Sequence, residues 1–238
     1  MATTSLVDRA HELSQNLANA LRLLPPDDPL WREDGKNDVA DFLFEIVILT
    51  EMLKALSAKF SIDVVRRKNG NIVLARKPAS KLQKSYFVIK IAGQEYQLLH
   101  GIDIRDRFGS TQAPDFSLHD DTSDDTADHR NVLAIWDAKL KGDTADHHAA
   151  RVSKPEVAEF LHMLDMLSVP KPGDNRDVLD GWPAAFEVSS IVSNGKLSTH
   201  PPQMFLEKGG SLTEHFTNAN TPCQPSRSQH LRSSRKRP

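Results

Sequence analysis

Residues 38–58, DVADFLFEIVILTEMLKALSA, restrict the fold more than any other segment, because they are apolar around nearly the whole circumference of a helix. A helix of this kind is stable only when other elements cover it. At about 100° per residue, Glu45 falls in the same column as Leu49 and Met52, whereas Glu51 lies on the opposite side. We therefore predict a core helix that carries the Glu45 carboxylate among apolar side chains.

Short strand-like segments follow this helix, bounded by turns that contain Gly or Asn: 61–65, 71–75, 85–91, 95–104 and 114–118. The remaining predicted elements are a strand at 131–141, a helix at 154–168 capped by Ser153, and a strand at 184–193. Helices and strands mixed in this order predict an α/β domain with a mixed central β-sheet flanked by α-helices.

The 238 residues suffice for one domain with flexible ends, and 39% hydrophobic residues suffice for a packed core. We divide the chain into an N-terminal helix and linker (1–30), a folded domain (31–207) and a disordered basic tail (208–238). The single cysteine, Cys223, excludes an intrachain disulfide and a multi-thiolate metal site. Because no apolar run approaches the ~20 residues of a membrane span and the N-terminus has no secretion-signal pattern, we expect a cytoplasmic protein.

The formal net charge is −2, from 30 Lys and Arg against 32 Asp and Glu. The basic residues of the segment 227–237 hide a more acidic body. A nucleic-acid partner would therefore have to meet a local basic surface, or bind through cations.

The strand predicted at 131–141 contains two candidate functional residues, Asp137 and Lys139. A period of two places Leu133, Ile135, Asp137, Lys139 and Lys141 on one face, and Val132, Ala134, Trp136 and Ala138 on the other. Burying Asp137 or Lys139 alone is costly, so each needs a partner. Antiparallel pairing with the short strand of APDFSL would bring Asp115 alongside Asp137.

Two adjacent carboxylates repel each other unless a cation lies between them. Carboxylate oxygens, with no histidine or cysteine required, favour a hard ion such as Mg²⁺ or Mn²⁺ over zinc. A lysine beside such an ion can hydrogen-bond the attacking water or the scissile phosphate. The pattern is typical of phosphodiester hydrolysis.

These residues resemble the PD-(D/E)xK, or restriction-endonuclease-like, nuclease superfamily. Pro114-Asp115 precedes Asp137-Ala138-Lys139 on a strand, a helix follows, and Glu45 lies on a core helix before the strands. The resemblance covers 38–193, about two-thirds of the chain, and implies a restriction-endonuclease-like fold for the domain at 31–207. The second acid is Asp rather than the more common Glu.

The resemblance implies a Mg²⁺-dependent nuclease that acts on DNA rather than RNA, with Mn²⁺ able to replace Mg²⁺. By the same resemblance, Asp115, Asp137 and the Ala138 carbonyl bind the ion, and Glu45 completes or bridges the site. Lys139 would position or activate water. Cleavage of both strands would suggest a homodimer, but the sequence identifies no interface.

Other interpretations stay open. Asp137 and Lys139 could form an ordinary ion pair at a solvated strand end, and Glu45 could pair with a basic residue of the sheet, leaving Glu51 as the functional acid. The acid-x-Lys triplet also occurs at 34–36, in a polar linker. His119 and the pair at 147–148 are interpreted as parts of solvated loops rather than metal ligands.

The same fold could also serve without catalysis, as a nucleic-acid-binding or protein-docking module of a defence or mobile-element system. A small-molecule or glycoside hydrolase with paired carboxylates is a third class, but it leaves the strand lysine unexplained. Metal-dependent cleavage of nucleic acid would distinguish a nuclease from both the non-catalytic module and the small-molecule or glycoside hydrolase.

Overall fold

The structure is a computed structural model. It describes residues 38–65, 72, 74, 77–120, 126–141, 151–171, 174, 176–197 and 211–213. The helix and linker predicted at 1–30, most of the strand predicted at 71–75, and the end of the tail after 213 lie outside these residues.

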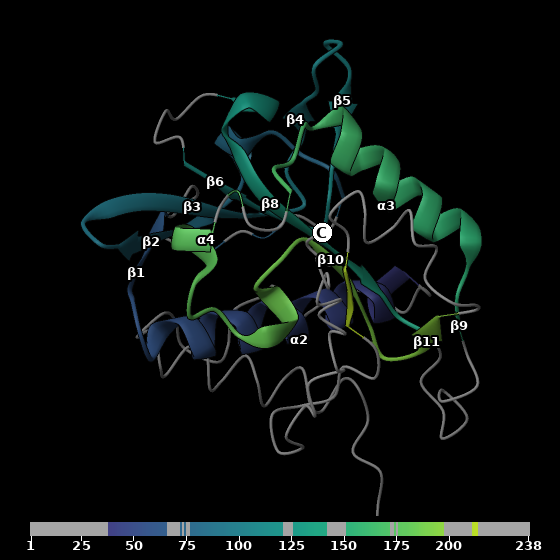
Figure 1. Cartoon of the computed structure of the whole chain (residues 1–238), viewed down its shortest axis with the longest axis horizontal. Helices are drawn as coiled ribbons and strands as arrows, with labels where there is room; N and C mark the ends of the chain where they lie inside the picture. Colours follow the sequence, from purple (N-terminus) through teal and green to yellow (C-terminus); the bar gives the residue numbers. More distant parts are fainter. Residues whose placement is uncertain are drawn as a thin grey trace, which may run out of the picture.

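A mixed, seven-stranded sheet forms the centre of the molecule (Figure 1). Its strands, in spatial order, are β1 (Ser61–Val65), β2 (Tyr86–Ile91), β3 (Gln94–His100), β6 (Phe116–His119), β8 (Val132–Lys139), β10 (Ser190–Ser193) and β12 (Ser211–Thr213). Neighbours from β1 to β8 are antiparallel, whereas β10 is parallel to both β8 and β12. The predicted α/β architecture with a mixed central sheet is thus confirmed.

Two longer helices, α2 (Asp38–Ser57) and α3 (Lys154–Met166), flank this sheet on opposite faces (Figure 1). The apolar side chains under α2 include Phe116 and Trp136, whereas those under α3 include Leu99 and Ile135. Neighbouring residues of one strand thus serve different cores, as the pleat of a strand requires. The sheet is covered on both faces, which explains why its central strands are so apolar.

Burial stabilises helix α2, and a capping box stabilises the start of helix α3. In α2 burial extends around the helix, and even Thr50 is 1% exposed, its hydroxyl donating to the Ile46 carbonyl at 2.7 Å. Helix α3 begins with a capping box: the Ser153 hydroxyl accepts from the Glu156 amide, and the Glu156 carboxylate accepts from the Ser153 amide at 2.6 Å. The predicted N-cap is therefore confirmed.

Shorter elements surround the main sheet. Two small sheets are formed by β5 (Thr111–Gln112), β4 (Ile104–Arg105) and β7 (Ala127–Asp128), and by β11 (Lys196–Leu197) and β9 (Arg151–Val152). The short helical segments are η2 (Lys81–Gln83), η3 (His129–Asn131), α4 (Arg176–Leu179) and η5 (Ala184–Phe186). Within the described part of the chain, no helix is long and apolar enough to cross a membrane.

Several boundaries differ from the sequence prediction. The strand predicted at 95–104 is divided at Gly101, whose positive φ of 56° turns the chain out of the main sheet. The segment predicted as a strand at 184–193 begins with η5 and becomes extended only at β10. Ser211–Thr213, assigned from composition to the tail, forms β12 beside β10.

Two side-chain predictions in the central strands were wrong. A bulge pairs His119 with Val132 directly after Leu118 with Ala134, so Val132 packs with the α3 core and Leu133 with the α2 core. His119 is the buried last residue of β6 rather than part of a solvated loop, and its Nε2 lies 3.0 Å from the Ser117 hydroxyl.

Candidate active site

The pairing of β6 with β8 brings the two predicted acids together. Phe116 is the register partner of Trp136, so Asp115, one residue before Phe116, lies beside Asp137, one residue after Trp136. The Asp115 Oδ2 atom accepts a hydrogen bond of 2.6 Å from the Ala138 amide. The predicted antiparallel pairing is confirmed. The Asp115 side chain, directly before β6, also binds the backbone near the end of β8.

Asp137 and Lys139 form a contact between a buried carboxylate and a half-buried ammonium group, rather than an ion pair in solvent. Lys139 Nζ lies 2.7 Å from Asp137 Oδ2, and the two side chains are 22% and 5% exposed, respectively. The Oδ2 atom is fully buried, and its positively charged neighbour is the Lys139 ammonium group. A buried carboxylate needs a positively charged partner, and in this structure the Lys139 ammonium group supplies it.

Glu45 approaches the same place from α2. Its Oε2 atom lies 2.9 Å from Nε2 of His100, the last residue of β3 and the register partner of Phe116. The Glu45 carboxylate is close enough to contribute to the raised pKa of Asp115, whereas Glu51 makes no such contribution. Of the two helix acids left open by the sequence, Glu45 is therefore the one near Asp115.

His100 is a site residue that sequence analysis missed. Its side chain is 1% exposed and packs against the rings of Phe116 and Phe42, with ring centroids 5.3 and 6.0 Å away. The available signal was a histidine at the end of the apolar strand YQLL, directly before a glycine turn. Its partner was not readable, because Glu45 lies 55 residues away on another element.

The electrostatics of the cluster are dominated by burial and by like charges. Burial, and then the negative charges of Asp137 and Glu45, hold the pKa of Asp115 well above its ordinary value of 3.8, and the Ala138 amide only partly offsets them. Burial lowers the pKa of Lys139, but the carboxylates of Asp137 and Asp115 outweigh it, so this pKa lies above 10.5. Lys139 is therefore an ammonium ion at neutral pH.

The donor chemistry fits a hard cation. Besides the carboxylates, the Ala138 carbonyl points toward the Asp115 side, because the amide and carbonyl of one strand residue face the same edge and the amide reaches Asp115. Among the described residues, however, no three His, Cys, Asp or Glu side chains lie close enough together to hold a metal ion. A metal site would therefore require two side-chain movements. Lys139 would have to turn away from Asp137, and Glu45 would have to turn toward Asp137.

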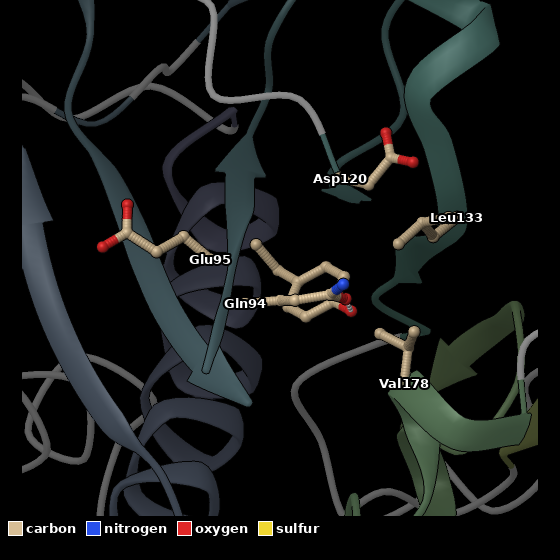
Figure 2. Close-up of a pocket in the computed structure, with 6 residues that line it drawn as sticks. Gln94, Glu95, Asp120, Leu133 and Val178 are labelled. Carbon is tan, nitrogen blue, oxygen red and sulfur yellow. Dashed lines mark hydrogen bonds between the residues drawn. The ribbon is translucent and has the colours of Figure 1, made fainter. Parts of the chain in front are cut away.

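A cavity of about 400 Å³ lies at the opposite end of the same strands (Figure 2). Its lining residues are Gln94, Glu95, Tyr96, Asp120, Leu133 and Val178. The Tyr96 hydroxyl donates to Gln94 Oε1 at 2.6 Å, and burial followed by the Asp120 charge raises the pKa of Tyr96. The cavity residues of β3 and β8, and Asp120 directly after β6, lie at one end of these strands, whereas His100, Asp115 and Asp137 lie at the other. The cavity is therefore separate from the acid cluster.

No protein-family model, curated protein or solved structure matches this chain. The acids, lysine and histidine at the adjoining ends of β3, β6 and β8 are the features from which a function can be inferred. The other histidines weighed in the sequence, at 147–148, lie outside the described residues.

Proposed function

We propose that this protein is a Mg²⁺-dependent nuclease that hydrolyses phosphodiester bonds in DNA. The observation that carries the proposal is the close arrangement of the buried Asp137 with the half-buried Asp115 and Lys139 on adjacent antiparallel strands. It is the arrangement expected from the resemblance to PD-(D/E)xK nucleases, with Glu45 contributed by the core helix.

The cost of this arrangement supports a functional explanation. Replacing buried ion pairs by apolar side chains often leaves a protein equally stable, so stability alone gives no reason to keep these groups inside. The raised pKa of Asp115 means that its ionisation opposes folding at neutral pH. Groups with such perturbed pKa values are concentrated at functional sites.

Each residue has a role in the proposed reaction. Asp115, Asp137 and the Ala138 carbonyl would hold the ion, and Glu45, fixed by His100, would complete its surroundings. When bound, Mg²⁺ polarises a phosphoryl oxygen and lowers the pKa of a coordinated water. Lys139, released from Asp137, would donate hydrogen bonds to the phosphate and stabilise the negative charge that develops there. Without the ion, the carboxylates of Asp137 and Asp115 raise the pKa of Lys139 and keep it an ammonium ion.

The test is cleavage of supercoiled plasmid and of end-labelled DNA and RNA oligonucleotides by the full chain with Mg²⁺, Mn²⁺ or EDTA. We expect nicking of DNA with either metal and none with EDTA. Asp137→Asn should lower the rate by about 10²-fold or more because it removes a charged ligand of the ion, and Lys139→Gln by a similar factor because it removes positive charge from the reacting phosphate. The matched control is Lys90→Gln, since Lys90 is also a strand lysine held by carboxylates, those of Asp63 and Glu95.

Two results would contradict the proposal. Turnover that persists in EDTA would remove the metal ion from the reaction. Nucleic-acid binding without cleavage under any of these conditions would instead favour the non-catalytic binding module.

A further inference from the structure

A hairpin made of β4 and β5 connects β3 to β6 along the chain, although β3 and β6 are themselves paired in the main sheet. Its two ends meet at the acid cluster, where the Gly101 amide donates to the Asp115 carbonyl at 2.8 Å. From this base the hairpin stands out of the main sheet beside the end of α3 (Figure 1). Any large molecule that reaches Asp115 from this side would also meet the hairpin.

The tip of the hairpin presents an aromatic ring to solvent. Phe108 is 69% exposed, and it and Leu82 are the exposed large hydrophobic residues in the described part of the chain. The guanidinium carbon of Arg107 lies 4.8 Å from the centre of the Phe108 ring. Leaving a phenylalanine in water gives up a large apolar burial, which a binding partner would recover.

The fold holds this tip in place. The buried Asp106 carboxylate accepts hydrogen bonds from the amides of Phe108 and Ser110, both at 2.9 Å, and from the Gln112 side chain at 3.0 Å. The Arg107 amide also donates to the last residue of α3, at the Met166 carbonyl. Because the hairpin is ordered before binding, little entropy would be lost when Phe108 meets a ligand.

Three arginines lie on the hairpin and on the segment that begins with β7, which pairs with β4. Arg105 is exposed on β4, Arg107 pairs with Asp165 at 2.9 Å, and Arg130 on η3 pairs with Asp128 at 2.8 Å. Both arginines of these pairs are exposed, at 40% and 76%, so the pairs contribute little stability and a phosphate can replace the carboxylate. Guanidinium groups bind phosphates, and aromatic rings stack on nucleobases, so the combination fits nucleic acid better than an apolar protein surface.

Two acidic residues of helix α3 give an estimate of the distance between the acid cluster and the hairpin. Glu159 acts electrostatically on Lys139, and Asp165 pairs with Arg107. These acids are separated by six residues, or about 9 Å along the helix axis, which corresponds to roughly three base steps of about 3.4 Å. We propose that Phe108 stacks on a nucleobase a few nucleotides from the scissile phosphate, while Arg105 and Arg107 contact the backbone. This inference rests on the proposed function and adds a substrate-binding element to it.

The experiment measures binding in EDTA, where no cleavage occurs, with the full chain and fluorescent DNA. The probes are a single strand, a blunt duplex and a duplex with one unpaired base, each with 2-aminopurine to report stacking. We expect Phe108→Ala to weaken binding about tenfold and to abolish the stacking signal, as loss of one base–aromatic stack predicts. Phe108→Trp should retain both, and Arg105→Gln should lower the salt dependence by about one phosphate contact.

Leu82→Ala is the matched control, because Leu82 is 50% exposed but lies on η2. It should bind like the wild type. Thermal melting of Phe108→Ala should match the wild type, since the ring is exposed. Unchanged DNA binding by Phe108→Ala would overturn the inference, as would sedimentation showing that Phe108 instead holds two copies of the chain together.

The two proposals fail separately. If the wild type cleaves DNA but Phe108→Ala binds normally, the hairpin inference is wrong and the nuclease proposal stands. If Phe108 supports stacking but no metal produces cleavage, the hairpin contact stands and the nuclease proposal is wrong. If the wild type binds none of the probes in EDTA, the hairpin inference is overturned, and the nuclease proposal is decided by the cleavage assay with Mg²⁺ or Mn²⁺.

Discussion

Asp115 shows how one side chain joins the fold to the proposed chemistry. Its Oδ2 atom closes the end of β8 by accepting the Ala138 amide, while its charge faces the carboxylates of Asp137 and Glu45. The first contact holds two strands in register, and the second makes the site unstable without a cation. The same atoms therefore set both the geometry and the electrostatics of the site.

His100 is expected to act as a positioning residue through Glu45. His100→Ala removes the hydrogen-bond partner of the Glu45 carboxylate and leaves it free to move. Loss of such an outer contact typically costs 10- to 100-fold in metal affinity or activity. We expect the Mg²⁺ concentration for half-maximal cleavage to rise by about that factor, with a smaller change in the rate at saturating Mg²⁺.

His100→Gln, which keeps an amide donor, should partly restore the metal dependence. The control is His119→Gln, because His119 is equally buried but lies at the other end of β6. If both histidine variants lose stability alike and neither changes the Mg²⁺ dependence, His100 has only a structural role.

At the level of elements, the sequence predicted what local patterns determine. The all-round apolar helix, the strands of β1, β2, β6 and β8, and the capped helix α3 all follow from periodicity and terminal residues. The antiparallel partnership of β6 and β8, and with it the proximity of Asp115 and Asp137, also followed from a short connection. These features depend on residues close together in sequence.

Features that depend on distant residues were not predictable. The bulge that exchanges the faces of Val132 and Leu133 is created by the pairing with β6, and it leaves no mark in the alternation of β8 itself. Strand β12 forms because β10 offers it a parallel edge, although its composition is that of a polar tail. The contact between Glu45 and His100 requires a helix to pack across a sheet.

The capping box of α3 is expected to contribute to the free energy of unfolding. Ser153→Ala removes the hydroxyl that accepts from the Glu156 amide and donates to the Glu156 carboxylate at 2.8 Å. We expect the free energy of unfolding in urea to fall by about 1 kcal/mol, with a range of about 0.5–2. Ser80→Ala is the matched control, because Ser80 precedes η2 without a capping hydrogen bond from its side chain. Equal losses in the two variants would contradict a capping role.

Ionisation of Asp106 and ionisation of Asp115 change the stability of the whole molecule in opposite directions as the pH rises. Hydrogen bonds from Gln112 and from backbone amides lower the pKa of Asp106, so its contribution to stability is present above pH 3.8 and is lost as the pH falls through the lowered value. The pKa of Asp115 is raised, so the unfolded chain ionises first. Stability is then lost as the pH rises from 3.8 toward the raised value, and this loss persists at neutral pH.

Asp115→Asn should therefore be more stable than the wild type at pH 8 in EDTA, with Tm higher by roughly 2–4 °C per kcal/mol of relieved repulsion. Saturating Mg²⁺ at about 100 times its Kd should stabilise the wild type by about 2.7 kcal/mol but stabilise Asp115→Asn less, which narrows or reverses the difference. Asp106→Asn is the control of opposite sign: it should lose stability at pH 8 and retain the full response to Mg²⁺. Thermal melts that show equal Mg²⁺ responses for the wild type and Asp115→Asn would place the ion elsewhere.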